Sequence, residues 1–443
     1  MPKESKEIIE LVKKERVSFI KLQFTDIAGT IKSVEVPVSQ LQKALDGEIA
    51  FDGSSIQGFV RIEESDMLLK PDLRTFRIFR WNDGNSDVSA RLICDVYNPD
   101  GTPFHGCPRL TLKRAMKAAA DMGYEVFTGS EAEFFLFLRD KEGRPTTITH
   151  DAAGYFDQAP FDLAEDARRK MVHILESLEY EVEASHHEVA PGQHEIDFKY
   201  EDALLSADYL LTFKVVVKKV AQDFGLYASF MPKPVAGING SGMHTHISLF
   251  KNGENAFYDP TKPMQVSDTC RHFAAGLLEH AAGMSAITNP TVNSYKRLVP
   301  GYEAPTHIAW SERNRSPLVR IPAKRGKGTR LEYRSPDPSS NPYLAMTVMI
   351  TAGLDGVKRG LTPPPPVNVN VFELSEKERK EYKITSLPGD LSEALNALEK
   401  DEIICSALGP HILTNFLRLK REEWSEYIAA VHQWELDRYL PLY

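Results

Sequence analysis

Residues 184–198 read ASHHEVAPGQHEIDF, a stretch that predicts two short antiparallel strands joined by a turn at Pro191-Gly192. If that turn is the centre of a hairpin, Glu188 and Glu195 face each other on the same side of the two strands, with their Cβ atoms about 5 Å apart. Two carboxylates at that separation repel unless a cation lies between them. Pro-Gly is not the favoured two-residue hairpin turn, so this register is a hypothesis. Taken alone, the stretch is better explained as a solvated acidic turn.

Three further segments place polar side chains on one face of a strand by the two-residue period. They are Glu131 and Glu133 in GSEAEFFLF, His244, His246 and Ser248 in GSGMHTHISLF, and Arg330, Glu332 and Arg334 in TRLEYRS. Each segment alone has a simpler explanation, namely a solvated strand end, a satisfied core histidine or a surface ion pair. The same pattern in four segments of one chain instead favours a shared metal-binding cleft.

The donor types in these segments indicate which metal is expected. Glutamates outnumber histidines, and hard oxygen donors suit Mg²⁺ or Mn²⁺, whereas zinc prefers Cys and His. The four cysteines are scattered without a C-x-x-C pair, which argues against a zinc knuckle or a disulfide framework. Because Mg²⁺ is usually found with substrate phosphates, a nucleotide substrate is expected. No P-loop or G-x-G-x-x-G motif occurs, so a P-loop or Rossmann enzyme is not favoured.

A basic segment between Arg313 and Arg334 holds six arginines and two lysines against one acidic residue, Glu332. A solvated basic loop is one explanation and RNA binding is another, but the segment has little aromatic interleaving. The preferred interpretation is an anion clamp, because Arg forks bind carboxylates and phosphoryl oxygens and stabilise charge on a transferring phosphoryl group. A kinase-like or ATP-driven ligase site follows.

The composition is that of an ordinary globular protein, with 42% apolar and 26% charged residues in 443. The net charge of −9 argues against nucleic acid or a membrane surface as a general partner. The N-terminal stretch is too charged for a signal peptide, and the longest apolar run, Tyr343 to Leu354, is too short to span a bilayer. A cytoplasmic location is expected.

The organisation of the chain predicts an α+β fold in two parts. Residues 1–97 carry short alternating segments typical of strands. The Pro/Gly-rich segment Asn98 to Pro108 predicts a boundary between a domain of residues 1–100 and one of residues 101–443. In the second part strands alternate with helices, the helices being expected at Leu110–Met122, Ala164–Leu178 and Ala203–Phe224. The prolines of Leu361–Asn368 predict a stiff connector, and helical patterns follow from Leu391.

Two longer strings resemble a known family. FDGSSIQGFVRIEESDMLL (Phe51 to Leu69) and KPVAGINGSGMHTHIS (Lys233 to Ser248) match the two signature patterns of glutamine synthetase, and NPTVNSYKRLVPGYEAP and RSPLVRIPAKRG are also similar. The similarity runs essentially end to end and resembles the bacterial type I enzyme. It implies a small N-terminal β-grasp domain followed by a large catalytic domain of antiparallel strands and helices. It also implies a dodecamer of two stacked hexameric rings, with each active site formed between neighbouring subunits.

The resemblance implies a role for each residue that matches the family's motifs. One metal ion would be held by Glu133, Glu188 and Glu195, and a second by Glu131, His244 and Glu332, with two or three Mg²⁺ or Mn²⁺ ions in each site. His186, His187 and His194 would not be ligands. Glutamate would bind Arg297, Arg334 and the Asn239-Gly240 backbone, with Arg320 and Arg315 near the phosphoryl group. ATP would contact Phe198, Tyr200, His246, Ser248, Lys327 and Arg330.

The implied reaction has two steps. ATP phosphorylates the γ-carboxylate of glutamate, and ammonia then attacks the acyl phosphate to give glutamine. Asp52, reaching in from the adjacent subunit, would bind ammonium and take its proton, because NH₄⁺ has no lone pair to attack with. Glu303, in the Pro/Gly-rich loop Asn289 to Pro305, would close the site and keep water from the intermediate. Without the resemblance, Asp52 is simply a turn aspartate in D-G-S-S.

Departures from the family pattern bear on regulation. The segment Val367 to Asp390 lacks the adenylylation motif, and Tyr382 lies in ERKEYKI, which does not match it. Control by adenylylation is therefore not expected. The chain resembles the shorter Gram-positive-type subgroup, in which Arg61 would correspond to an arginine tied to feedback by glutamine. In that subgroup the inhibited enzyme can also engage transcriptional regulators of nitrogen genes, which are a further expected partner.

Two rival functions remain. The first is a ligase on the same scaffold that joins glutamate to a polyamine or other amine; the presence of Asp52 and Glu303 favours ammonia instead. The second is a structural or sensor protein that has kept the fold without catalysis, and the six filled ligand positions argue against it.

Overall fold

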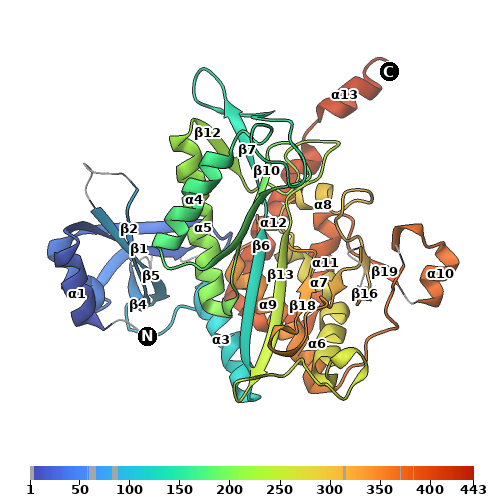
Figure 1. Cartoon of the computed structure of the whole chain (residues 1–443), viewed down its shortest axis with the longest axis horizontal. Helices are drawn as coiled ribbons and strands as arrows, with labels where there is room; N and C mark the ends of the chain where they lie inside the picture. The colour runs from blue at the N-terminus through green and yellow to red at the C-terminus, as the bar shows by residue number, and fades with distance from the viewer. Residues whose placement is uncertain are drawn as a thin grey trace.

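A computed structural model of the chain describes residues 4–56, 58, 66–81, 88–312, 316–369, 371–382 and 384–443. Two residues with predicted roles, Arg61 and Arg315, lie outside this description. Figure 1 shows a small N-terminal part beside a larger body, in which long strands run through the centre and helices pack around them. No helix among the described residues is long and apolar enough to cross a membrane.

The N-terminal part is one five-stranded sheet with the order β2-β1-β5-β4-β3. Strands β1 and β5 at its centre are parallel, and the other pairs are antiparallel. Helix α1 buries Ile8 and Val12 in the core of this sheet. The elements are α1 (Ser5–Lys14), β1 (Val17–Thr25), β2 (Ile31–Pro37), α2 (Leu41–Leu45), β3 (Ile49–Asp52), β4 (Asp66–Phe79) and β5 (Val88–Tyr97).

Two sheets form the centre of the larger part. The first has the order β11-β6-β13-β18-β17-β16, and the second has the order β12-β7-β10-β9 with β8 paired to β7. The first comprises β6 (Glu125–Ala132), β11 (Glu201–Asp202), β13 (Met243–Lys251), β16 (Trp310–Ser311), β17 (Val319–Arg320) and β18 (Leu331–Tyr333), with β14 (Glu254–Asn255) beside β13. The second comprises β7 (Phe134–Arg139), β8 (Pro145–Thr149), β9 (Val182–His187), β10 (Gln193–Phe198) and β12 (Leu226–Ser229).

The helices of this part pack around the sheets and fill one large apolar core. The apolar run Tyr343 to Leu354 lies inside α9 and is almost entirely buried there, which is typical of a core helix that is hydrophobic all round. Helix α9 begins at an N-cap, Asn341, and ends at Gly360 in the left-handed conformation. The helices are α3 (Pro108–Asp121), α4 (Glu165–Ser177), α5 (Ala203–Asp223), α6 (Asp268–Glu279), α7 (Ala281–Thr288), α8 (Ser294–Arg297) and α9 (Pro342–Arg359).

A buried ionic network joins the two parts. Arg109, at the start of α3, donates to Asp95 of β5 at 2.9 Å and to Asp72 of β4 at 2.8 Å. Its guanidinium also makes a two-point contact with Asp208 of α5, at 2.9 and 2.8 Å. Tyr343 of α9 donates to the same Asp208 at 2.6 Å. The N-terminal sheet is therefore tied to helices α3, α5 and α9 of the larger part.

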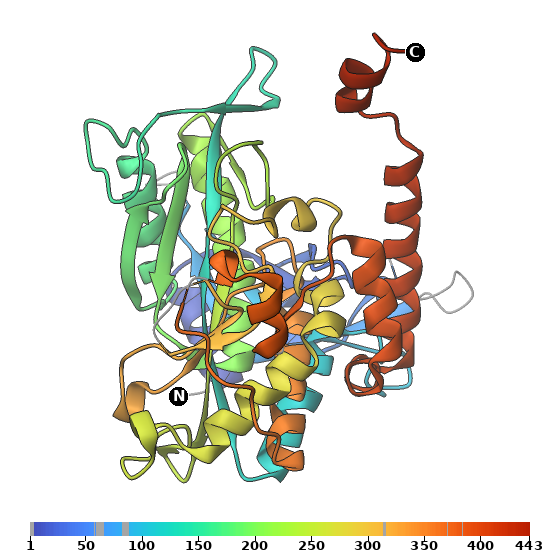
Figure 2. The same ribbon diagram turned by 90° about the vertical axis from the view of Figure 1, so that its right-hand side faces the viewer.

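The C-terminal segment leaves the body. After the extended connector, the chain forms α10 (Glu376–Glu381), α11 (Leu391–Lys400), α12 (Glu402–Ala429) and α13 (Gln433–Tyr439), while β15 (His307–Ile308) pairs with β19 (Thr385–Ser386). Helix α12 contains a kink at Gly409-Pro410. Figures 1 and 2 show α13 projecting away from the rest of the molecule. The helices expected at Leu110–Met122, Ala164–Leu178 and Ala203–Phe224, and those expected from Leu391 onward, are confirmed.

Candidate active site

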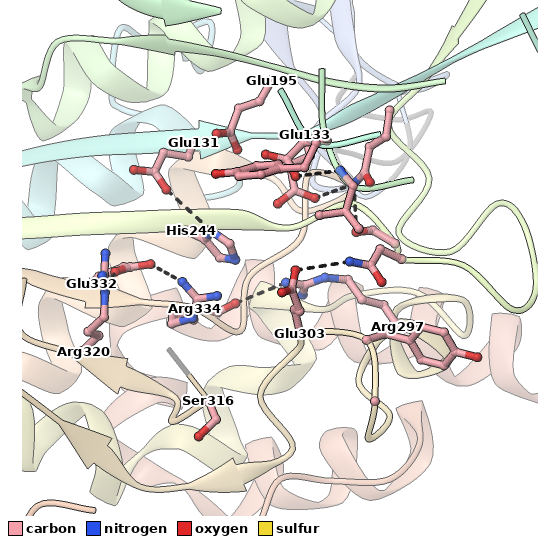
Figure 3. A pocket seen from close by; sticks show the side chains of 18 of the residues that line it. Glu131, Glu133, Glu195, His244, Arg297, Glu303, Ser316, Arg320, Glu332 and Arg334 are labelled. Atoms are coloured by element: carbon pink, nitrogen blue, oxygen red, sulfur yellow. Dashed lines mark hydrogen bonds and ion pairs between the residues drawn. The ribbon is translucent and has the colours of Figure 1, made fainter. Parts of the chain in front are cut away.

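A polar cavity of about 930 Å³ opens between the two sheets of the larger part. Figure 3 shows Glu131, Glu133 and Glu195 on one side of it and three arginines on another, with Glu332 and Glu303 on the side of the arginines. Twelve of the residues with predicted roles line it: Glu131, Glu133, Glu188, Glu195, Asn239, Gly240, His244, Arg297, Glu303, Arg320, Glu332 and Arg334. All six predicted metal ligands and five predicted substrate-binding residues that are described therefore converge on one cavity.

The hairpin at Pro191-Gly192 brings two of these glutamates together, but in a different register from the predicted one. His186 pairs with Glu195, and the Glu188 N–H donates to the Gln193 carbonyl at 2.8 Å. Glu188 and Glu195 are thus diagonal neighbours, and the prediction that they lie directly opposite is wrong. Val189 N–H donates to the Glu188 side chain at 3.1 Å and not across the hairpin. A shift of two residues keeps both carboxylates on the same face.

The prediction that Glu131 and Glu133 share one strand is also wrong. Strand β6 ends at Ala132 and β7 begins at Phe134, so Glu133 lies at the point where the chain passes from one sheet to the other. The Glu133 N–H still donates to the Gly242 carbonyl at 3.0 Å, next to the start of β13. Both carboxylates reach the cavity from this junction.

The first group of possible metal ligands comprises Glu131, His244 and Glu332, whose donor atoms lie within 4.8 Å of one another. Burial raises the pKa of Glu131, but the neighbouring His246 and His244 outweigh this effect and hold it well below its usual value. Burial also opposes ionisation of Glu332, yet the charge of Arg334 outweighs it and lowers the pKa of Glu332 to about 2. These carboxylates are therefore ionised and ready to bind a cation at neutral pH.

The second group comprises His186, Glu188 and Glu195. Burial, together with the negative charge of Glu133, raises the pKa of Glu188 to about 8. Burial and the nearby Asp197 raise the pKa of Glu195 as well. Carboxylates crowded in this way lack a compensating positive charge, and a bound divalent cation would supply it. The oxygen-rich donor set fits Mg²⁺ or Mn²⁺, which is the fit expected of the predicted metal site.

His186 lies closer to this group than the resemblance implies. Its Nδ1 is 3.5 Å from Glu188 Oε1 and its Nε2 is 3.3 Å from Glu195 Oε1. Glu133, the third ligand that the resemblance implies, instead accepts hydrogen bonds through Oε2 from Gln193 at 2.7 Å and from Gly242 N–H at 3.0 Å. Burial lowers the pKa of His186, so its imidazole is neutral at neutral pH and adds no charge to balance the carboxylates.

The arginines form the opposite wall of the cavity. Arg320 and Arg334 both donate to the carboxylate of Glu332, one to each oxygen. Arg297 is 3% exposed, and it donates to the carbonyl oxygens of Ser335 at 2.7 Å and of Arg334 at 3.3 Å. These contacts fix the guanidinium groups in place before any substrate binds, as expected of a preorganised anion site.

Glu303 lies on a loop that lines this cavity. Its backbone has φ +56°, a conformation that residues other than Gly, Asn and Asp rarely adopt. The Asn239 side chain donates to Glu303 Oε2 at 3.3 Å. Lys233 Nζ lies 3.6 Å from the centre of the Tyr302 ring, a cation–π contact. The loop that carries Glu303 is thus held against the segment that carries Asn239.

The residues predicted to contact ATP are spread along β13, β10 and the basic segment. His246 accepts a hydrogen bond from Arg330 at its Nδ1 (3.1 Å), so its Nε2 carries the proton and donates to Glu131 Oε1 at 2.7 Å. Ser248 follows on β13, Tyr200 is 44% exposed, and Lys327 lies in the 3₁₀ turn Gly326–Gly328. The side chain of Phe198 is buried in the core against Tyr180. None of these six lines the cavity among the residues described.

Asp52 ends β3 in the N-terminal sheet and is exposed to solvent there. Hydrogen bonds from Ser54, whose N–H lies 2.8 Å from Oδ1, lower the pKa of Asp52. It does not line the cavity of its own chain. A role in catalysis would therefore require the cavity of another subunit.

A third group of metal-ligand types, His150, Asp151, Asp162 and His194, lies behind the hairpin and outside the cavity. Arg168 already provides the cation there: its guanidinium lies 2.6 Å from Asp162 Oδ2 and 3.0 Å from His194 Nδ1. Because that contact occupies the His194 lone pair, Nε2 carries the proton and cannot bind a metal. This group is a structural polar network.

The sequence reasoning missed several residues of the cavity wall: Tyr155, Gln193, Tyr302, Ser316, Asn368 and Phe372. Gln193 could have been considered, because it directly follows the Pro-Gly turn of the quoted hairpin. The two-residue period of a strand, however, does not distinguish a buried amide side chain from a solvent-exposed one. The partners of Gln193, Glu133 and Gly240, also lie far from it in the sequence.

Comparisons with known proteins show the family of the chain. Residues 16–99 match the family model described as "Glutamine synthetase, beta-Grasp domain", and residues 105–439 match "Glutamine synthetase, catalytic domain". The chain belongs to the glutamine synthetase family. Among curated relatives, the glutamine synthetase of Thermus thermophilus is 62% identical over 440 residues, which cover 99% of both chains. That of Clostridium saccharobutylicum is 58% identical over 100% of both.

Solved structures show the same fold. A complex of GmaS with ADP has a TM-score of 0.89 at 32% identity, over 100% of both chains. The cryo-EM structure of Plasmodium falciparum glutamine synthetase has a TM-score of 0.86 at 28% identity and covers 99% of both. The predicted α+β fold, with a β-grasp domain followed by a large catalytic domain, is confirmed. Like its family, the protein is a ligase that uses divalent metal ions and ATP.

Proposed function

We propose that this chain ligates ammonia to L-glutamate with ATP, through a γ-glutamyl phosphate, giving glutamine, ADP and phosphate. One observation supports the proposal most strongly: the carboxylates of Glu131, Glu133 and Glu195 lie on one side of the cavity, and three arginines lie on another: Arg297, Arg320 and Arg334. The chemistry needs both, because the phosphate donor and the accepting carboxylate are each anionic and repel one another. Relatives named glutamine synthetase favour ammonia over a polyamine as the amine substrate.

The proposed ligands hold ions at two positions, with Glu133, Glu188 and Glu195 at one and Glu131, His244 and Glu332 at the other. Bound Mg²⁺ or Mn²⁺ would neutralise phosphate charge and polarise the transferring phosphoryl group. Arg297, Arg334 and the Asn239-Gly240 backbone would bind glutamate. Arg320, together with Arg315, would stabilise the charge that develops during phosphoryl transfer. The nucleotide would lie near Phe198, Tyr200, His246, Ser248, Lys327 and Arg330.

The second step needs a neutral nucleophile. Asp52 of a neighbouring subunit would bind NH₄⁺ and accept a proton, and its lowered pKa keeps it an anion suited to a cationic ligand. Ammonia then attacks the acyl carbon and phosphate leaves. Glu303 would close the cavity during this step and exclude water, in keeping with its contact to Asn239. An active site of this kind fits the proposed dodecamer of two hexameric rings.

The direct test measures phosphate release and glutamine formation with ATP, glutamate and Mg²⁺ or Mn²⁺, adding ammonium or putrescine. Activity that requires both metal and ammonium is expected. Activity with putrescine alone would support the rival amine ligase, and no ATP-dependent activity at all would support a non-catalytic role.

An active site that combines residues of two subunits leads to a specific prediction for Asp52 and Glu303. Asp52→Ala is expected to lower glutamine formation at least a hundredfold, in line with the loss of a group that transfers protons. Glu303→Ala is also expected to lower it strongly, because water would then reach the intermediate. If Asp52 serves the neighbour's site, co-expressing the two variants restores part of the activity, because some interfaces combine both intact residues. Full turnover by both single variants would contradict these roles. Asp100→Ala, an exposed turn aspartate of the same part of the chain, is the control and keeps its activity.

Further proposals concern regulation, location and organisation. We propose feedback by glutamine through Arg61, binding to nitrogen-responsive transcriptional regulators, and no control by adenylylation. Tyr382 packs half-buried against the apolar cluster of Val371 and Leu374, which supports the last point. We also propose a cytoplasmic location, where ATP and free glutamate are available, and a domain division at residues 1–100 and 101–443. Nucleic acid and membranes are not proposed as direct partners.

A further inference from the structure

Gln193 begins β10, and its buried side chain lies where three parts of the cavity meet. Its Nε2 donates to Glu133 Oε2 at 2.7 Å and to the Gly240 carbonyl oxygen at 3.1 Å. Its Oε1 accepts a hydrogen bond from Ala190 N–H, within the hairpin turn, at 3.2 Å. The residue is 1% exposed, so these partners use both amide donors and the acceptor away from water.

The contact restricts how Glu133 can bind an ion. Oε2 accepts two hydrogen bonds, from Gln193 and from Gly242 N–H, and is turned toward these donors. Among the residues described, Oε1 accepts no hydrogen bond, and the residue lines the cavity. Oε1 is therefore the oxygen that is available to a cation, and the hydrogen bonds on Oε2 fix its direction. Groups that orient a metal ligand in this way commonly change metal affinity by 10–100-fold when removed.

The second donor of the same amide reaches the segment proposed to bind glutamate. Gly240 follows Asn239, and a Cβ on Gly240 would lie 2.2 Å from the Pro232 carbonyl oxygen, so only glycine fits there. The Gln193 amide thus fixes the distance between the Glu133 carboxylate and the Gly240 carbonyl. Gly240 lies 47 residues after Gln193 in the sequence. A carboxylate in place of this amide would repel Glu133, and a hydrocarbon would leave three polar groups without a partner.

We infer that Gln193 is a positioning residue, which presents Glu133 to one metal ion through Oε1 alone and couples that ion to the glutamate-binding backbone at Gly240. The role of Gln193 in orienting Glu133 toward a metal ion rests on the geometry of the cavity. The coupling to glutamate binding also rests on the proposed function, since it takes glutamate as the ligand at Asn239-Gly240.

The first test is Mn²⁺ binding by Gln193→Met, a substitution of similar volume that removes the amide. Free Mn²⁺ is measured by electron paramagnetic resonance during titration of the protein, without ATP, glutamate or ammonium. We expect at least one class of sites to bind about tenfold more weakly than in the wild type, or weaker still. Ile196→Val is the matched control, because Ile196 is buried in the same strand and packs in the apolar core. It lowers the melting temperature without changing Mn²⁺ affinity.

Steady-state kinetics test the coupling. At saturating Mn²⁺ we expect Gln193→Met to regain most of its kcat while the KM for glutamate stays several-fold raised, because the Gly240 carbonyl has lost its donor. A loss of stability alone would not separate KM from kcat in this way. Unchanged Mn²⁺ affinity, or equal losses in Ile196→Val, would overturn the inference. Failure of the proposed function would look different: wild-type protein would bind Mn²⁺ but form no glutamine.

The wild-type protein provides a test that does not depend on a variant folding. In a crystal soaked with Mn²⁺, anomalous scattering locates the ions. We expect Glu133 to bind one ion through Oε1, with Oε2 still accepting from Gln193 and Gly242. Two-oxygen binding by Glu133, or an ion on Oε2 with Gln193 turned away, would overturn the assignment.

Discussion

Single side chains show how the cavity is prepared for a cation. Glu188 and Glu195 are buried close to Glu133 and Asp197, and this crowding raises the pKa of Glu188 to about 8 and raises that of Glu195 too. At the other group, cationic neighbours lower the pKa of Glu332 to about 2. One half of the site therefore carries its own compensating charge, and the other half depends on a bound ion or on protons.

This difference predicts how stability depends on pH in metal-free protein. Glu188 has a folded pKa of about 8 against a usual value of 4.5, so the folded state binds more protons than the unfolded state between these values. Its contribution to stability is present below pH 4.5 and is lost as the pH rises toward 8. Because Mn²⁺ competes with these protons, we expect the rise in melting temperature on adding Mn²⁺ to be larger at pH 8 than at pH 6.

Differential scanning fluorimetry at several pH values, with EDTA or with Mn²⁺, checks this. Glu188→Gln removes the titrating group and should flatten the metal-free pH dependence between pH 6 and 8. Equal slopes for the variant and the wild type would show that Glu188 does not titrate in this range.

Between elements, the junction of the two parts depends on Arg109. It contacts Asp72, Asp95 and Asp208 from three different elements and is 2% exposed. Burial raises the pKa of Asp72, but hydrogen bonds from Arg74 and the charge of Arg109 outweigh it and hold that pKa below its usual value. Without the guanidinium, three acidic groups would be left close together in a poorly solvated junction.

Arg109→Met is therefore expected to lower the free energy of unfolding by about 3–5 kcal/mol, the usual cost of removing one partner of a buried ion pair. Chemical denaturation followed by circular dichroism measures the change. Lys117→Met on the same helix is the control, since Lys117 forms an exposed pair with Asp121 and should change little. A similar small effect for both variants would mean that the junction is held mainly by apolar packing.

Elements also show what the sequence could predict. The helices at Leu110–Met122, Ala164–Leu178 and Ala203–Phe224 were predictable to within two residues, because their apolar positions recur regularly. The convergence of Glu188 and Glu195 followed from the two-residue period. Their register did not, because Glu188 bonds to Gln193 while the N–H groups of Val189 and Ala190 bond to side chains, which no local pattern predicts. The passage between sheets at Glu133 and the contacts of Gln193 depend on tertiary packing, which has no local pattern.

At the scale of the whole molecule, the C-terminal segment stands apart. Helix α13 projects from the body, and large apolar side chains on and around it are exposed, among them Trp434 at 61%, Leu440 at 73% and Val431 at 70%. An apolar projection of this kind favours burial against another subunit. It is therefore suited to contacts between subunits of the proposed dodecamer.

Removing residues 431–443 is expected to give smaller particles than the full-length protein by light scattering, because the apolar contacts of the projection are lost. Trp434→Ser should shift the assembly in the same direction, whereas Arg438→Ser, an exposed change on the same helix, should not. Unchanged particle size after truncation would assign assembly to other surfaces.

The junction at Glu133 has a mechanical consequence. The backbone there passes from one sheet to the other within a single residue, and the carboxylates on either side of it, Glu131 and Glu195, belong to strands of different sheets. In the proposed arrangement one ion binds strands of the first sheet, and the other binds the hairpin of the second sheet together with Glu133, at the junction between them. Metal binding would then restrict motion of the backbone at this junction, and loss of the metal would release it. Metal occupancy and the rigidity of the junction would therefore change together.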